Sequence, residues 1–208
     1  CATGRLGLAR NLEAWEMVSA FRHIRDETEG RVSGAVFMGQ GEPLHNYDQV
    51  IQAARVLSDP CGGRISARGI SVSTVGLVPQ ILRYAEEDHP FRLVVSLTSA
   101  LAHRRSRLMP VTRRHGLPEL AAAIRTLAER RRERVTVAWV VMAGVNTGPE
   151  EVSALRDLLK DIPVRLNLID VNDARDGGYQ RAGALEMQAF LDSFSAKNPE
   201  RQEDPAFA

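Results

Sequence analysis

The chain has 208 residues, of which 44% are hydrophobic and 25% are charged. These are ordinary values for a globular protein, and they exclude a disordered chain, a collagen and a coiled-coil rod. A formal net charge of +1 does not produce the strong field of an obligate nucleic-acid binder, although all but two of the 27 basic residues are arginine. Since no apolar run approaches the roughly 18 residues of a membrane span, we expect a soluble protein.

The first predicted helix begins after Asn11, a suitable N-cap residue, and ends near Gly30. Its apolar residues recur at helical spacing and are expected to share one face: Trp15, Val18, Phe21 and Ile24.

Short apolar runs then alternate with segments of helical period. The expected strands are 35–38, 70–74, 93–97, 135–141 and 164–169. Five further helices are expected. One begins at about residue 47, three begin near Pro79, Pro118 and Pro149, and one covers 185–194. An arginine-rich connection precedes Pro118. Five strands and six helices in strict alternation predict right-handed βαβ units around a parallel sheet. We therefore expect an α/β fold, a partial (βα)6 TIM-like barrel over residues 1–197 whose first strand precedes the chain, followed by a polar tail over 198–208.

Ligands bind at the C-terminal ends of the strands in such folds, and the loop after strand 35–38 offers a carboxylate there. Residues 38–44 (MGQGEPL) lack the third glycine of a dinucleotide loop, and Pro43 stands where its helix would begin. Gly41 and Glu42 instead suit an ammonium group, whose hydrogen bonds the carboxylate accepts. The alternative is a plain turn with a solvated glutamate.

Hydroxyl and amide groups follow three further strands. Ser73 and Thr74, Ser96 and Thr98, and Asn172 are expected at the same edge as the carboxylate. They suit a carboxylate or a ribose, or they only cap the following helices. Four successive strand ends with polar groups exceed what capping requires.

Two cysteines, Cys1 and Cys61, are too few for a disulfide framework, which favours a reducing, cytoplasmic compartment. A chain that opens on cysteine is either processed or a fragment, and we interpret it as a fragment cut upstream. Cys61 lies in the turn before strand 70–74, where we expect a structural role.

These motifs resemble those of the RlmN and Cfr adenosine methyltransferases of the radical S-adenosylmethionine superfamily, over residues 1 to about 180. The matching segments are 1–4 (CATG), 7–8, 10–12, 36–44 (VFMGQGEPL) with 46–47, 73–79 (STVGLVP), 96–97, Arg105, 108–110 (LMP) and 167–169 (NLI) with Asn172.

The resemblance implies a radical SAM barrel with a 4Fe–4S cluster and S-adenosylmethionine as cofactors. Cys1 would then be one of three thiolates that hold the cluster. Gly41 and Glu42 would hold the methionyl ammonium group of the cofactor. The rest of the cofactor site would be lined by Ser73, Ser96, Leu97, Thr98 and Asn172.

The resemblance also implies methylation of C2 of an adenosine in 23S rRNA, and in some members tRNA, through a methyl-cysteine intermediate. The expected enzyme is a cytoplasmic monomer without membrane contact that takes electrons from a donor such as flavodoxin or ferredoxin. Cfr-like methylation of C8 stays open, because both kinds of enzyme share these motifs. The methyl-carrier and resolving cysteines are expected outside the chain, so we assign it no catalytic residue and expect the fragment to be inactive.

The chain departs from the family pattern at two internal positions. Thr98 replaces the histidine of a Ser-Leu-His motif, and Thr112 stands where asparagine is usual. Two other classes of protein are alternatives. One is a degenerate radical SAM scaffold that only binds RNA. The other is an unrelated metal-dependent barrel enzyme, whose ligands the five histidines do not supply at strand ends.

Two groups of arginines differ in their expected roles. Arg104, Arg105, Arg107, Arg113 and Arg114 follow strand 93–97 on the predicted ligand face. They suit RNA phosphates, with a solvated loop or one arginine that orders the cofactor site as alternatives. The second group lies at the opposite end of the barrel and is expected to be surface charge only: Arg130, Arg131, Arg132 and Arg134.

Overall fold

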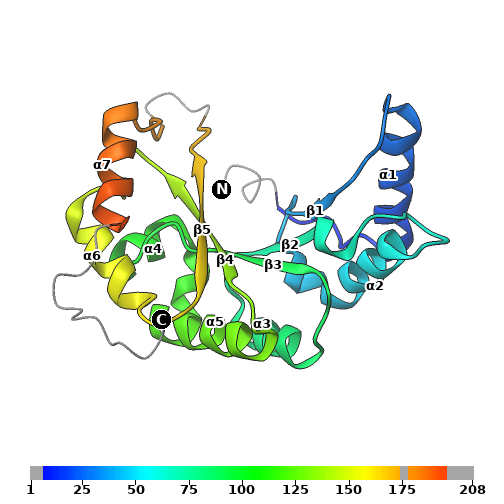
Figure 1. Cartoon of the computed structure of the whole chain (residues 1–208), viewed down its shortest axis with the longest axis horizontal. Helices are drawn as coiled ribbons and strands as arrows, with labels where there is room; N and C mark the ends of the chain where they lie inside the picture. Colours follow the sequence, from blue (N-terminus) through cyan, green and yellow to red (C-terminus); the bar gives the residue numbers. More distant parts are fainter. Residues whose placement is uncertain (1–6, 174–177, 196–208) are drawn as a thin grey trace, which may run out of the picture.

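The computed structural model describes residues 7–173 and 178–195. It contains one parallel sheet with strands in chain order, from β1 at one edge to β5 at the other (Figure 1). The strands are β1 (Ala35–Phe37), β2 (Ile70–Thr74), β3 (Arg92–Ser96), β4 (Val135–Val141) and β5 (Val164–Asp170). All five predicted strands are confirmed, with ends that differ by at most one residue. The predictions for Cys1 and for the tail over 198–208 lie outside the described residues.

The six predicted helices are also present. They are α1 (Ala14–Glu27), α2 (Tyr47–Ser58), α3 (Val78–Glu86), α5 (Leu117–Arg131), α6 (Pro149–Leu158) and α7 (Ala184–Ser195). A proline lies in the first turn of α3, α5 and α6, where its missing N–H is not needed. The predicted strict alternation is wrong at the arginine-rich connection, because α4 (Ala102–Leu108) forms there. Among the helices of the described ranges, none is both long and apolar enough to cross a membrane.

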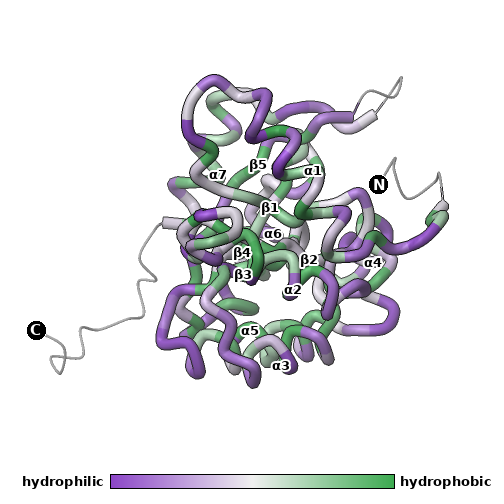
Figure 2. The backbone as a smooth tube through the Cα atoms, turned by 90° about the vertical axis from the view of Figure 1, so that its right-hand side faces the viewer, coloured by the Kyte–Doolittle hydropathy of each residue, from purple (hydrophilic) through white to green (hydrophobic). Residues whose placement is uncertain are grey.

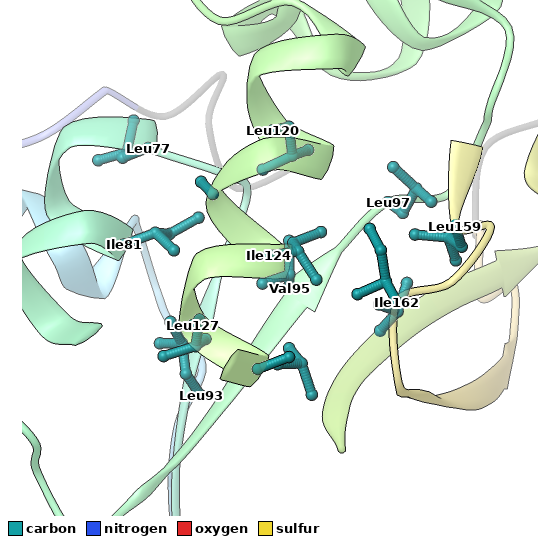
Figure 3. Packing of buried hydrophobic residues seen from close by; sticks show 14 of the residues in the cluster. Leu77, Ile81, Leu93, Val95, Leu97, Leu120, Ile124, Leu127, Leu159 and Ile162 are labelled. Carbon is teal, nitrogen blue, oxygen red and sulfur yellow. The ribbon is translucent and has the colours of Figure 1, made fainter. Parts of the chain in front are cut away.

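The main core lies between the sheet and the layer of helices on one of its faces (Figure 1). Hydrophobic residues concentrate along the central strands β3 and β4, whereas the outer loops are hydrophilic (Figure 2). In Figure 3, the side chains of β3 meet those of α3 and α5. The labelled residues of these three elements are Leu93, Val95, Ile81, Leu120, Ile124 and Leu127, and Leu97 and Leu77 lie directly after β3 and directly before α3. This packing holds the strand ends at fixed positions relative to one another.

A smaller cluster connects α1 to the edge of the sheet near β1, and here one prediction is wrong. Phe21 packs with Ala54 and Leu57 of α2. Trp15 and Ile24, expected on the same face, are 63% and 58% exposed. The buried stripe of α1 instead contains Ala14 and Phe21, and Trp15 and Ile24 lie at its two flanks. The N-cap is Glu13, which forms a capping box with Glu16 at N3, and not Asn11.

The other face of the sheet has small and polar side chains. Successive residues of a strand point to opposite faces, so the residues that alternate with the core-facing ones share this second face. The register places Ser96 of β3 beside Ala138 of β4, and Ala138 beside Asn167 of β5. Ser73 of β2 lies beside Val94, two residues before Ser96. This face leads to the C-terminal ends of the strands, where the candidate site lies.

Candidate functional site

The loop after β1 places the carboxylate of Glu42 against the end of β2. Gly41 adopts φ +129°, a backbone conformation that only glycine adopts readily. Glu42 is the N-cap of the short 3₁₀ helix Pro43–Asn46 and accepts a hydrogen bond from Leu44 N at 3.0 Å through Oε1. Its Oε2 accepts a second one from Val75 N at 2.8 Å. Glu42 is therefore partly buried and oriented rather than fully solvated, and a carboxylate with about four acceptor positions still has capacity for an ammonium group.

The hydroxyl groups at the ends of β2 and β3 divide into two kinds. Thr74 accepts from Gly76 N at 3.1 Å, and Ser99 Oγ accepts from Leu101 N at 3.2 Å, so these two stabilise turns. Ser73 and Ser96 form no side-chain hydrogen bond with any residue that the structure describes. Both lie on the face of the sheet opposite the main core, where Ser73 is 6% exposed and Ser96 is half-buried. The capping alternative therefore applies to Thr74 and Ser99, whereas the hydroxyls of Ser73 and Ser96 cap no turn among the described residues.

Leu97 and Thr98 lie directly after β3, in a bent backbone. The Leu97 side chain is fully buried in the core, and its backbone N–H donates to Ala138 O at 2.9 Å. Thr98 adopts φ +61°, which is rare for a β-branched residue. Ser99 N donates to Leu97 O at 2.7 Å across the turn, and Asn146 Nδ2 donates to Thr98 O at 2.7 Å. Two hydrogen bonds thus hold this strained turn, and the Thr98 side chain remains 8% exposed.

Arg105 of α4 lies beneath these strand ends and is fully buried. Its guanidinium group donates to Val75 O at 2.8 Å, to Ser96 O at 3.3 Å and to Leu97 O at 3.2 Å. It also donates to Thr112 Oγ1 at 2.5 Å, so the residue that departs from the family pattern completes this network. Burial lowers the pKa of Arg105 to about 10, which leaves the group charged at neutral pH.

The expectation that Arg105 contacts RNA is therefore wrong, because no face of its side chain is open to a phosphate. The alternative of one arginine that orders the cofactor site agrees with its hydrogen bonds, since they join the end of β2 to the end of β3.

Two further buried polar residues support the loop after β3. Glu151 of α6 is 1% exposed and accepts from Ser99 Oγ at 2.5 Å and from Ala100 N at 2.9 Å. It also pairs with Arg104 at 2.5 Å, which removes a second arginine from the expected RNA cluster. Sequence analysis did not single out Glu151, because it lies in the first turn of α6, where an acidic residue is common.

Asn146 is the other residue that sequence reasoning missed. It is fully buried, donates to Thr98 O and Val140 O, and accepts from Met142 N. Its signal in the sequence is weak, because asparagine before Thr-Gly is also typical of an exposed turn.

The remaining predicted site residues are less constrained. Asn172 is exposed and follows β5, whose ladder with β4 continues to Val171. Asn172 therefore lies beyond the strand at one edge of the sheet and Glu42 beyond the strand at the other. Cys61 is exposed in the turn before β2 and does not fill the core, and its structural role stays a prediction. Within the described ranges, no group of three or more His, Cys, Asp or Glu residues is placed to hold a metal ion.

The chain is similar to several known proteins, although no family model matches it. It is 51% identical over 199 residues to a probable RNA methyltransferase of Anaeromyxobacter sp. strain Fw109-5, covering 96% of this chain and 59% of that protein. It is 41% identical over 196 residues to the probable dual-specificity RNA methyltransferase RlmN of Moorella thermoacetica, covering 92% of this chain and 55% of that protein.

Solved structures agree with this similarity. The crystal structure of a radical SAM methyltransferase from Sphaerobacter thermophilus superposes with a TM-score of 0.85 at 36% identity, covering 93% of this chain and 58% of that one. A domain of a pyruvate-formate lyase-activating enzyme from Bacteroides vulgatus matches with a TM-score of 0.56 at 19% identity and shows a shared fold alone. Membership of the radical SAM methyltransferases implies S-adenosylmethionine and a 4Fe–4S cluster as cofactors. The chain belongs by sequence and fold with the RlmN-like radical SAM RNA methyltransferases, and it spans a little over half the length of the relatives it matches.

Proposed function

We propose that this chain forms the S-adenosylmethionine-binding core of an enzyme that methylates C2 of an adenosine in 23S rRNA or tRNA. The observation that carries the proposal is the set of free polar groups at one edge of the sheet. Glu42 keeps acceptor capacity beside β2, and the hydroxyls of Ser73 and Ser96 have no partner among the described residues. These groups match the ammonium, carboxylate and ribose of the proposed cofactor.

The described residues therefore fit the cofactor, and each has a distinct proposed task. Glu42 accepts hydrogen bonds from the methionyl ammonium group. Ser73 and Ser96 donate to or accept from its other polar groups, together with the backbone around Thr98 and the amide of Asn172. Arg105 holds the ends of β2 and β3 at the spacing that this binding requires. Cys1, the proposed cluster ligand, lies outside the described residues.

Radical chemistry suits the proposed substrate, because C2 of adenine is neither nucleophilic nor acidic enough for ordinary methyl transfer. When bound, S-adenosylmethionine supplies the methyl group and, with the cluster, the one-electron chemistry that activates it. The methyl-cysteine intermediate and an electron donor such as flavodoxin or ferredoxin are part of the same proposal.

RNA would approach over the exposed arginines next to this edge. Arg107, Arg113 and Arg114 are exposed, whereas Arg104 pairs with Glu151 and Arg105 is buried. Arginine side chains of this kind contact phosphates without reading sequence.

The test is an anaerobic assay of the full-length protein that the gene encodes, reconstituted with iron and sulfide. It is incubated with methyl-labelled S-adenosylmethionine and either 23S rRNA or tRNA, and the digested nucleosides are identified by mass spectrometry. We expect 2-methyladenosine with the wild type and at least a tenfold lower yield with Glu42→Gln. A product methylated at C8 would favour the Cfr-like alternative. Cofactor binding without any methylated nucleoside would favour the degenerate RNA-binding scaffold.

A further inference from the structure

A hollow of about 650 Å³ lies at the end of the sheet opposite to the candidate cofactor site. It is formed where β3, β4 and β5 begin and where α5 ends, together with the segment before β2. Its charged lining residues are Arg68, Arg92, Arg131, Glu133, Arg134 and Arg165. Five arginines against one glutamate leave a strongly positive lining in a chain whose total formal charge is only +1.

Most of this charge is not neutralised within the described part of the protein. Arg131 is the exception, because it donates to His89 O and lies 3.7 Å from Glu133. The four other arginines are exposed and form no hydrogen bond or ion pair with a described residue. They are Arg68, Arg92, Arg134 and Arg165. Like charges collected around a concave surface create a local potential that attracts an anion.

The positions of two of these arginines are set by the sheet. Arg92 lies beside Ser71 of β2, and Arg165 lies beside Thr136 of β4. Each is separated by an even number of residues from Ser96 or Asn167 on its own strand, so both belong to the face of the sheet that the core leaves uncovered. One strand, β4, lies between the two strands that carry these arginines, and both side chains line the same hollow.

Planar guanidinium groups bind phosphate oxygens through paired N–H donors, and they do so better than compact ammonium groups. The volume is within the roughly 300–1,000 Å³ range of small-molecule sites, and it is larger than a single phosphate needs. We infer that this hollow binds the phosphate groups of a nucleotide-sized ligand, either as part of an RNA backbone or as a free phosphorylated compound.

This inference differs from the expectation of surface charge only for part of the second arginine group, since Arg131 and Arg134 line the hollow while Arg130 and Arg132 do not. It does not rest on the proposed methylation, because the arginines lie at the far end of the strands from Glu42.

The experiment compares two double variants that remove the same charge. Arg92→Gln with Arg165→Gln changes the hollow. Arg22→Gln with Arg130→Gln changes two exposed arginines that lie outside it and also lack described partners. Binding of a labelled single-stranded RNA is followed by fluorescence anisotropy at several salt concentrations, and binding of inorganic pyrophosphate by calorimetry.

We expect the hollow variant to raise the dissociation constant of at least one probe tenfold or more, and the control variant to stay within twofold of the wild type. For RNA, the plot of log affinity against log salt concentration should become less steep by about 1.4, because each of the two lost phosphate contacts contributes roughly 0.7 to the slope for a single strand. A loss confined to pyrophosphate identifies a free phosphorylated compound, and a loss for RNA identifies the backbone.

Three results would overturn the inference: equal losses in both variants, no loss for either probe, or tighter binding of an acidic polyglutamate peptide than of both phosphate probes. S-adenosylmethionine binding is measured in the same proteins and should not change in either variant. Failure of cofactor binding in the wild type would contradict the proposed function while leaving the phosphate result intact.

Discussion

The two ends of the sheet use the same residue type in opposite ways. At the C-terminal end, Arg105 is fully buried and its guanidinium group donates to three backbone carbonyls and a hydroxyl. At the N-terminal end, Arg92, Arg134 and Arg165 are exposed and have no partner among the described residues. A buried charge must be compensated by the protein, whereas an exposed one is compensated by water or a ligand. Substitution of an arginine should therefore affect stability at the C-terminal end and ligand binding at the N-terminal end.

The largest effect is expected at Arg105. Replacement by Met removes the donor to Val75 O, Ser96 O and Leu97 O, of which Leu97 O keeps its bond from Ser99 N. The free energy of unfolding in urea should fall by about 3–5 kcal/mol. Arg107→Met, an exposed position on the same helix, should change it by less than about 0.5 kcal/mol. Similar values for the two variants would contradict the role of Arg105 as the link between β2 and β3.

Glu151 should rank next among the buried groups. Glu151→Ala leaves Ser99 Oγ, Ala100 N and Arg104 without their acceptor, and we expect a loss of about 2–4 kcal/mol in unfolding free energy. The matched control is Glu150→Ala, one residue earlier, which loses only a favourable helix-dipole interaction of up to about 1 kcal/mol. Equal losses at both positions would mean that the buried network contributes nothing beyond the helix start.

Glu42 tests ligand binding at the C-terminal end. In the full-length protein that the gene encodes, Glu42→Gln should weaken S-adenosylmethionine binding by about 1.5–3 kcal/mol, the value of a charge-assisted hydrogen bond. Glu150→Gln should leave the affinity unchanged. Since Glu42 also accepts from Leu44 N and Val75 N, thermal unfolding of the same variant separates a folding defect from a binding defect. Equal affinities of the two folded variants would remove Glu42 from the proposed site.

Thr98 should produce a smaller change. Thr98→Val deletes the hydroxyl but keeps the β-branched shape, so the cost of its positive φ is the same in both proteins. If the hydroxyl contacts the cofactor, calorimetry should show a loss of about 0.5–1.5 kcal/mol in affinity. Thr98→His should be tolerated.

Ser96→Ala is the companion to the Thr98 measurement, because Ser96 lies two residues earlier at the same strand end. If Thr98→Val keeps the wild-type affinity for S-adenosylmethionine and Ser96→Ala loses affinity, Thr98 is removed from the proposed cofactor site and Ser96 stays in it. If both variants bind normally, β3 does not contribute to the cofactor site.

The smallest stability effect is expected at the opposite end of the sheet. Arg134→Gln removes one of several like charges and no described contact, so the unfolding free energy should stay within about 0.5 kcal/mol of the wild type. Any change should be a small gain that shrinks at high salt, because screening weakens repulsion between exposed charges. A loss above 1 kcal/mol would reveal a stabilising partner and would contradict the contrast between the two ends.

The sequence by itself determined the strands, six of the helices and the family. Apolar runs such as Val135–Val141 and the prolines at helix starts are local signals, because burial pattern and backbone restriction act within a few residues. The candidate residues Gly41, Glu42, Ser73 and Ser96 were also predictable in position, because the C-terminal ends of parallel strands share one edge. For Ser73 and Ser96, the local sequence did not distinguish a hydroxyl that contacts a ligand from one that caps the following helix.

Only the tertiary structure decided which polar residues are buried. Helix α4 was missed because its sequence, AHRRSRL, has no apolar stripe. Arg105 holds it in place through carbonyls of the residues that directly follow β2 and β3. Glu151 likewise finds its partners some 50 positions away in the chain. The hollow at the opposite end unites Arg68, Arg92, Arg134 and Arg165, which are dispersed along the sequence and meet only because parallel strands begin at the same edge. Burial and charge clustering are properties of contacts between distant segments, and no local pattern encodes them.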